Sequence, residues 1–222
     1  MHRLLLATRN RHKTAELAAM LGPCFQVEDL NAHPEMPETP ETGATFLENA
    51  TLKAVAASRF FGGDLLVLAD DSGLEVDALG CEPGVRSARF AGEGATDRQN
   101  LELLLAKLQG EPNRAARFRC AIALARGGER TAVFEGACEG RILDAPRGRD
   151  GFGYDPVFVP EGCVQTFAEI PAEAKNVLSH RAKAMALALA WLQAMPPGAD
   201  RATARCSPVV DVCSGRSHPP PH

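Results

Sequence analysis

An apolar run that ends in two adjacent carboxylates is the feature that most constrains the fold of this chain. Residues 65–69 read Leu-Leu-Val-Leu-Ala, and Asp70-Asp71-Ser72-Gly73 follows directly. The run predicts a buried strand bounded by turn residues, with the acidic pair at its exit, at the mouth of a sheet, where α/β proteins place their chemistry. Two carboxylates about 4 Å apart repel by about 4 kcal/mol at an effective dielectric of about 20, so a shared proton or a divalent cation is expected to relieve them. The alternative is a solvated turn with a helix-capping aspartate.

The remaining pattern alternates between strands and helices. Further strands are predicted over 3–7, 74–79, 117–125 and 131–143, the last two as a hairpin that turns at Gly127-Gly128. Helices are predicted over 10–21, 44–61, 97–108 (capped by Asp97) and 173–195, and 31–43 is expected to be an acidic loop. This mixture predicts the α/β class, with a mixed central sheet flanked by helices.

Composition indicates one folded domain and argues against several classes of protein. A chain of 222 residues, 45% hydrophobic and 23% charged, is long enough for one α/β domain, which we assign to residues 1–198. Residues 199–222 contain Pro219-Pro220-Pro221, lack apolar periodicity and are predicted to be disordered. A net charge of −4 argues against a nucleic-acid partner, which requires a basic face. No apolar run approaches the length of a membrane span, so no membrane partner is expected.

Cysteine usage indicates the compartment. The seven cysteines are odd in number, have no C-x-x-C spacing, and follow an N-terminal segment that does not resemble a secretory signal. We therefore expect reduced thiols in a cytoplasmic protein, without a disulfide framework or a zinc site.

Thr8-Arg9-Asn10-Arg11-His12-Lys13 joins the first predicted strand to the first predicted helix. The start of a helix offers unpaired backbone N–H groups and the positive end of a dipole, so the segment can bind phosphate, although it lacks the glycines of a Walker P-loop. The alternative is a capped helix with a basic first turn. Cations there oppose the dipole, and a bound anion would resolve that conflict.

Two later segments also carry candidate ligand contacts. The glycine-flanked aromatics of Gly151-Phe152-Gly153-Tyr154-Asp155 fit a flat ligand that stacks on a ring; a tight turn with a buried aromatic is the alternative. Lys175 and Ser179-His180-Arg181 lie in the last predicted helix, where neighbouring side chains point in different directions. This spacing argues against a Ser-His hydrolase and favours anion and ligand contacts, with Lys175 as a point charge and Arg181 as a planar fork.

In this order, the segments resemble the inosine triphosphate pyrophosphatase family over roughly residues 3–195. The resemblance rests on six motifs: Thr8-x-Asn10-x-x-Lys13, Glu48-Asn49-Ala50, 69–74, 83–89, 152–156 and Ser179-His180-Arg181. It implies two lobes with the active-site cleft between them, and a cytoplasmic, Mg²⁺-dependent homodimer. It also implies cleavage of ITP, dITP and XTP to a monophosphate and pyrophosphate.

The resemblance further implies roles for individual residues. Asp71 would be the catalytic carboxylate and a metal ligand, with Glu41 as the second metal ligand. The residues expected to contact the purine nucleotide are Thr8, Arg9, Asn10, Arg11, His12, Lys13, Ser72, Phe152, Gly153, Tyr154, Asp155, Lys175, His180 and Arg181. Within this set Phe152 would stack on the purine.

One position departs from the family pattern. The family has Glu-Lys before the Ser-His-Arg triplet, whereas this chain has Ala174-Lys175, with Glu173 one position earlier. We expect that the missing acid is a charge partner of a basic residue, so that its loss reduces affinity without abolishing activity.

Two other functions remain compatible with the sequence. One is a related nucleotide pyrophosphatase with modified or pyrimidine substrates, which a substrate panel would separate. The other is a nucleotide-binding module without catalytic activity, which would bind ITP and Mg²⁺ without turnover.

Overall fold

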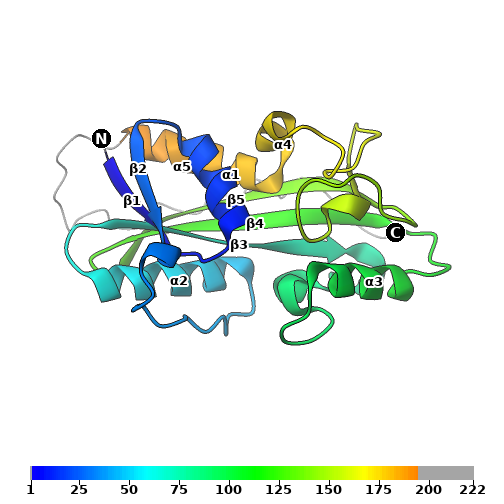
Figure 1. Ribbon diagram of the computed structural model, residues 1–222, viewed down its shortest axis with the longest axis horizontal. Helices are drawn as coiled ribbons and strands as arrows, with labels where there is room; N and C mark the ends of the chain where they lie inside the picture. Colours follow the sequence, from blue (N-terminus) through cyan, green and yellow to red (C-terminus); the bar gives the residue numbers. More distant parts are fainter. Residues whose placement is uncertain (1, 195–222) are drawn as a thin grey trace, which may run out of the picture.

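A mixed six-stranded sheet forms the centre of the protein (Figure 1), whose computed structural model describes residues 2–194. The strands lie in the order β2-β1-β3-β4-β5-β6. Their bounds are β1 His2–Leu6, β2 Phe25–Asp29, β3 Leu66–Val76, β4 Ala115–Arg126, β5 Glu129–Ile142 and β6 Phe158–Pro160. β1 is parallel to β2 and β3, and the other pairs are antiparallel, so the predicted mixed sheet is confirmed. The tail predicted to be disordered, 199–222, lies outside the described residues.

Five α-helices flank the sheet: α1 Arg11–Leu21, α2 Phe46–Phe61, α3 Asp97–Lys107, α4 Ala172–Leu178 and α5 His180–Ala194. α2 and α5 lie on opposite sides of the sheet (Figure 1), and α1 lies on the side of α5. No helix of the described part is long and apolar enough to cross a membrane. The predicted helices over 10–21, 44–61 and 97–108 are confirmed to within two residues at each end. The cap of α3 is Thr96, not Asp97, because Thr96 and Gln99 form a reciprocal capping box.

The two strands predicted over 65–69 and 74–79 are one continuous strand, β3, so the placement of the acidic pair at a strand exit is wrong. Asp70 and Asp71 lie in the middle of β3 and pair with Ile122 and Ala121 of β4. The reason is that the antiparallel pairing of β3 with β4 continues through residues 70–73. The parallel neighbour on the other side, β1, pairs only as far as Leu68. Beyond that point one edge of β3 is left without a strand, and this edge opens into a cleft.

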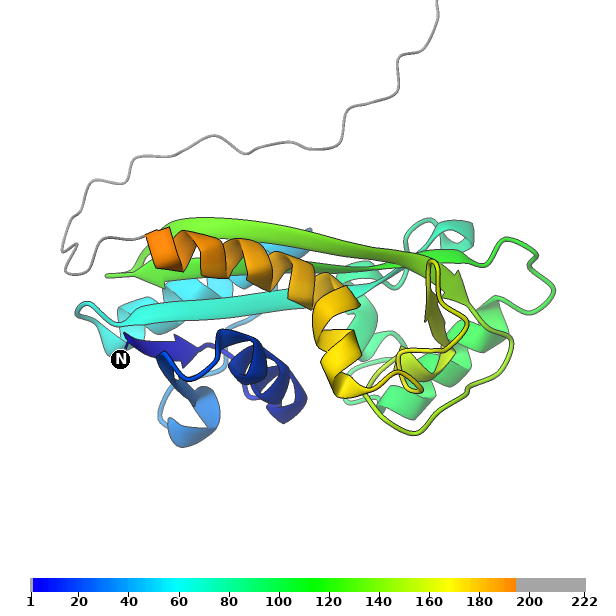
Figure 2. The ribbon, with the colours of Figure 1, turned by 90° about the horizontal axis from the view of Figure 1, so that it is seen from above.

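The prediction of a single helix over 173–195 is also wrong, because the helix is interrupted at Ser179. Ser179 has extended backbone angles, and α4 and α5 meet there at an angle (Figure 2). The break allows His180 and Arg181 to begin a new helix that packs along β5. Both residues are thereby buried beneath the cleft.

The five cysteines of the described part are free thiols, as expected. Burial raises the pKa of Cys120 to about 12 and that of Cys138 to about 11. Both thiols are therefore protonated and unreactive near neutral pH.

Candidate active site

A cavity of about 770 Å³ lies where β1 ends and β3 continues. This volume is typical of small-molecule sites. Segments from most of the length of the chain line it: 7–10, Lys13, Leu30, 37–42, Lys53, 71–73, Val85, 87–89, 93–95, Asp97, Asn100, Phe118, 152–155, Lys175, His180 and Arg181. The cleft therefore gathers all three candidate segments into one place.

Asp70 faces the side of the sheet that α1 and α5 cover. Its Oδ2 lies 3.1 Å from Lys13 Nζ and 3.2 Å from Arg181 Nη2, and the side chain is fully buried. Burial alone would raise the pKa of Asp70, but Lys13 and Arg181 outweigh burial and hold the pKa well below its usual range. Asp70 is thus a permanent anion that positions two cations. Its other oxygen, Oδ1, has no hydrogen-bond partner among residues 2–194.

Asp71 faces the opposite side, toward α2. Asn49 Nδ2 donates to Asp71 Oδ2 over 3.2 Å, and Lys53 Nζ donates to Asp71 Oδ1 over 3.0 Å. Lys53 also reaches Glu41 Oε1 at 2.7 Å, so one ammonium joins the two carboxylates. Burial raises the pKa of Asp71, although Lys53 opposes the shift. Burial would also raise the pKa of Glu41, but Lys53 holds it below its usual value.

Asp70 and Asp71 point to opposite faces of the sheet, because successive residues of a strand alternate. Each carboxylate therefore pairs directly with different cations: Asp70 with Lys13 and Arg181, and Asp71 with Lys53. Sequence reasoning missed Lys53. The signal was present in the spacing, because Lys53 follows Asn49 by four residues and both therefore lie on one face of α2.

Glu41 and Asp71 are the carboxylates that could hold a metal. Both contact the Lys53 ammonium, so a position for a cation between them already exists. The described residues contain no group of three or more His, Cys, Asp or Glu side chains arranged around a metal position. This donor set fits Mg²⁺, which commonly takes one or two carboxylates and completes its shell with water and phosphate oxygens.

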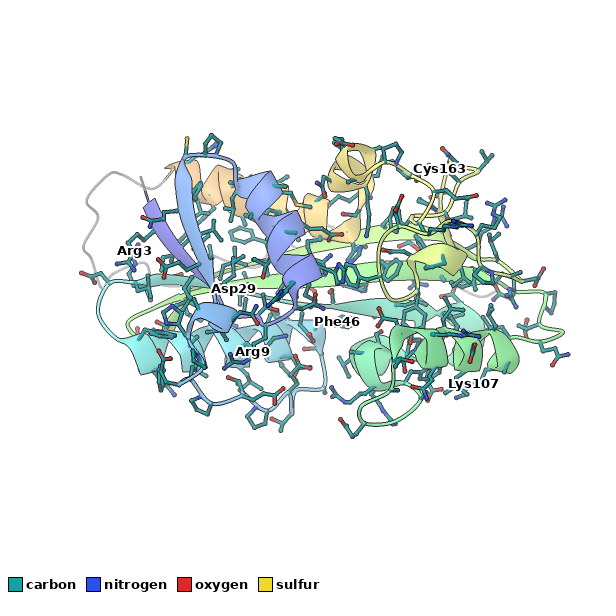
Figure 3. The ribbon with its side chains drawn as sticks, viewed as in Figure 1. Arg3, Arg9, Asp29, Phe46, Lys107 and Cys163 are labelled. Atoms are coloured by element: carbon teal, nitrogen blue, oxygen red, sulfur yellow. The ribbon has the colours of Figure 1, made fainter. Side chains whose placement is uncertain are left out.

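The 8–13 segment is a capped helix start. Asn10 Oδ1 accepts from the backbone N–H groups of His12 (2.9 Å) and Lys13 (3.2 Å), and Thr8 Oγ1 accepts from Asn10 N. Arg9 is directed elsewhere: its guanidinium donates to the carbonyls of Leu30 and Met36, and it lies next to the turn that follows β2 (Figure 3). In this segment Thr8, Arg9, Asn10 and Lys13 line the cavity.

Arg11 and His12, the other two residues of the 8–13 segment, are exposed and do not line the cavity. Arg11 interacts with Asp29, whereas the His12 ring stacks on Phe152.

The 151–155 segment forms a tight loop at the far wall of the cavity. Gly151 has a φ of +78°, and a Cβ there would lie 2.3 Å from Asp155 Oδ2, so only glycine fits. Asp155 Oδ2 accepts from Phe152 N over 2.9 Å, and Asp97 Oδ2 accepts from Gly153 N over 2.7 Å. Tyr154 is buried and donates its hydroxyl to Ser87 O. These bonds fix the loop and leave the half-buried Phe152 at the cavity.

Glu16, which sequence reasoning also missed, joins the two buried cations of the last helices. Lys175 Nζ lies 2.9 Å from Glu16 Oε1 and 2.6 Å from Asp155 Oδ2. Arg181 Nη1 donates to Glu16 Oε2 over 2.5 Å, and Arg181 Nη2 donates to Ser72 Oγ over 2.8 Å. The charge of Lys175 is therefore balanced without a glutamate at position 174, where Ala174 packs against apolar core residues.

His180 is buried below this network. Its ring stacks on Phe118 with centroids 4.8 Å apart, and its Nδ1 is without a partner among residues 2–194. Burial, helped by Arg181, lowers its pKa well below 6.5. The imidazole is therefore neutral at the cavity floor.

Comparison with known proteins places this architecture in a family. The chain is 52% identical over 184 residues to a dITP/XTP pyrophosphatase of Exiguobacterium, covering 82% of this chain and 93% of the relative. The structure of the Staphylococcus aureus Ham1 protein superimposes with a TM-score of 0.77 at 39% identity, covering 86% of this chain and 98% of that one. A dITP/XTP pyrophosphatase from Mycobacterium abscessus gives 0.68 at 45% identity, covering 87% and 100%. The Ham1 family model matches residues 4–191, and this chain belongs to the Ham1 family.

Proposed function

We propose that this chain hydrolyses non-standard purine nucleoside triphosphates (ITP, dITP and XTP) to the monophosphate and pyrophosphate. The reaction would remove these nucleotides before they enter DNA or RNA. The observation that carries the proposal is one cavity that holds buried carboxylates, cations from α1, α2, α4 and α5, and an aromatic ring fixed by a glycine loop. The names of the relatives support the same activity.

The triphosphate would lie against the start of α1. Lys13 and Lys53 supply positive charge there, and Thr8 and Asn10 supply side-chain polar groups. Ser72 lies next to this position on β3, where it accepts from Arg181. Hydrolysis of a triphosphate depends chiefly on positioning and charge neutralisation, which these groups provide.

Asp71 would orient the attacking water and accept its proton. Its raised pKa supports this role, because a base is more effective when its pKa approaches the working pH. Glu41 and Asp71 would hold Mg²⁺, which supplies charge neutralisation at the phosphate oxygens when bound. Lys53 would then move from its position between the two carboxylates toward the phosphates.

The purine would stack on Phe152 and be selected by hydrogen-bond polarity. Lys175 and Arg181 are buried donors without any acceptor function. A 6-oxo purine presents an acceptor to such donors, whereas adenine presents an amino group. Each buried donor left without a partner costs about 1–3 kcal/mol. This cost supports discrimination against ATP by roughly 10²-fold or more.

The remaining parts of the proposal concern the whole molecule. We assign residues 1–198 to one pyrophosphatase domain, in agreement with the family match over 4–191. A cytoplasmic homodimer that binds neither nucleic acid nor membrane stays a prediction from the sequence. Size-exclusion chromatography with light scattering tests the dimer.

A substrate panel tests the activity. Phosphate and pyrophosphate are measured separately after incubation of ITP, dITP, XTP, ATP, GTP and dUTP with Mg²⁺. Pyrophosphate as the sole inorganic product from ITP and XTP supports the proposal. Orthophosphate as the product, or a preference for dUTP, contradicts it, and a pyrimidine preference would favour the related pyrophosphatase.

A further inference from the structure

The Phe152 ring, the surface on which a purine would stack, is already covered in the free protein. The His12 ring stacks on it, with centroids 5.3 Å apart and planes inclined by 18°. Lys175 Nζ lies 5.0 Å and Arg181 Cζ 5.8 Å from the same centroid. A purine that stacks on the face covered by the imidazole must displace it.

These covering groups differ greatly in how firmly they are held. Lys175 is buried between the carboxylates of Glu16 and Asp155, and Arg181 is buried against Glu16 and Asp70. Moving either cation would leave buried charges without partners, at high cost. They are fixed parts of the cavity wall.

His12 is held by the stack alone. The residue is exposed, and within residues 2–194 its ring makes no hydrogen bond or ion pair. Only its backbone N–H is fixed, by the Asn10 cap. The imidazole can therefore leave Phe152 by a side-chain rotation, which on exposed residues takes ps to ns.

We infer that His12 is a displaceable cover of the Phe152 stacking face, and that a purine binds by taking the place of its imidazole. The inference rests on the proposed function and deepens it. It assigns His12 a part in base binding, in contrast to the phosphate contact expected from the sequence. Lys13, whose ammonium lies 3.1 Å from the Asp70 carboxylate, lines the same cavity as Phe152 and could meet the phosphates of the bound nucleotide.

The cover lowers the apparent affinity for any ligand that must displace it. Aromatic pairs of this kind are worth enough to change a dissociation constant by about twofold to tenfold. Removing the imidazole should therefore strengthen base binding by that factor. A ligand without a base has no need to displace His12, so its affinity should not change.

Titration calorimetry tests this with an inosine triphosphate analogue that has an imido bridge between the α- and β-phosphates, and with tripolyphosphate as the ligand without a base. His12→Ala is expected to bind the analogue about twofold to tenfold more tightly and tripolyphosphate unchanged. His12→Phe is the matched control: it keeps a ring on Phe152 and is expected to bind the analogue no better than the wild type. Weaker binding of both ligands by His12→Ala would instead make His12 a phosphate contact, and an unchanged affinity for the analogue would also overturn the inference.

A measurement without ligand separates this inference from the proposed activity. In the free protein the ring protons of His12 should show an upfield ring-current shift in NMR, which Phe152→Leu abolishes. Absence of that shift overturns the cover even if ITP is hydrolysed. Conversely, tight binding of the analogue without pyrophosphate release from ITP overturns the activity and leaves the cover intact.

Discussion

Replacing Lys53 by methionine tests whether its ammonium stabilises Glu41 and Asp71, the two carboxylates proposed to bind Mg²⁺. Methionine keeps most of the apolar stem of Lys53 but removes the ammonium that lies 2.7 Å from Glu41 and 3.0 Å from Asp71. The Lys53 side chain is only 14% exposed, so water cannot replace the lost charge effectively. Removing one partner from a buried ion pair costs about 3–5 kcal/mol. For a chain of this size that corresponds to a fall in Tm of roughly 6–20 °C at pH 7 without metal.

The loss of Tm in Lys53→Met should depend on pH and become smaller in acid. Burial would raise the pKa of Glu41, but the ammonium of Lys53 holds it below 4.5 in the folded wild type. The stabilisation from that carboxylate is therefore present above pH 4.5 and is lost as pH falls through the folded pKa. The difference in Tm between wild type and Lys53→Met should accordingly shrink in acid, where the carboxylates become protonated and need no partner.

Thermal unfolding by circular dichroism, with and without Mg²⁺, measures both effects. Lys107→Met is the control, because Lys107 forms a similar 2.8 Å ion pair with Glu82 but both side chains are about half exposed; it should cost at most about 1 kcal/mol. Mg²⁺ should raise the Tm of Lys53→Met more than that of the wild type, since the metal no longer competes with an ammonium. Equal Tm losses in the two variants, or an equal response to Mg²⁺, would refute this description of the site.

Three further predictions concern Asp71 and the packing of α5 on the sheet. Asp71→Asn should lower kcat for ITP by at least ~10²-fold, because it removes the proposed base; retention of more than about a tenth of wild-type pyrophosphate release would exclude that role. Gly136→Ala should lower the free energy of unfolding by about 1–3 kcal/mol in urea titrations, because its Cβ would lie 2.3 Å from His180 O and 2.6 Å from Ala184 N; an unchanged urea midpoint would show that α5 shifts freely. His180 stays neutral in the fold although its pKa is 6.5 when exposed, so Tm should fall as pH drops below 6.5, and His180→Phe should flatten that fall; parallel profiles would contradict the burial argument.

Much of the fold could be predicted because the local pattern and the tertiary burial agree. Along β4 the alternating residues Phe118, Cys120, Ile122 and Leu124 are all buried on one face, as their spacing indicated. The strands that prediction missed, β2 and β6, are short and obtain their structure by pairing with β1 and β5 at the edges of the sheet. Their conformation depends on distant partners more than on their own sequence.

The continuity of β3 shows where local reasoning fails. Asp-Asp-Ser-Gly has the composition of a turn. The strand persists because Lys13 and Arg181 neutralise Asp70 from one side while Lys53 neutralises Asp71 from the other. These cations are 57, 111 and 18 residues away along the chain, and no window of sequence around the acids contains all of them.

The candidate site was predictable as a set of segments but not as a network. Five of the six motifs contain residues that line the cavity, whereas Glu48-Asn49-Ala50 does not. Glu16 was missed because its partners, Lys175 and Arg181, come from helices far along the chain. Arg9 was placed among the ligand contacts because it lies within a motif, although two backbone carbonyls hold its guanidinium.

Asp70 and Asp71 point to opposite faces of β3, and this determines which groups a substitution of each carboxylate can affect. The carboxylate proposed for chemistry contacts α2, whereas the one that anchors Arg181 contacts α1 and α5. A substitution at Asp70 would therefore affect Arg181 and Lys13 together, whereas the direct partners of Asp71, which are Asn49 and Lys53, lie on the other face of the sheet.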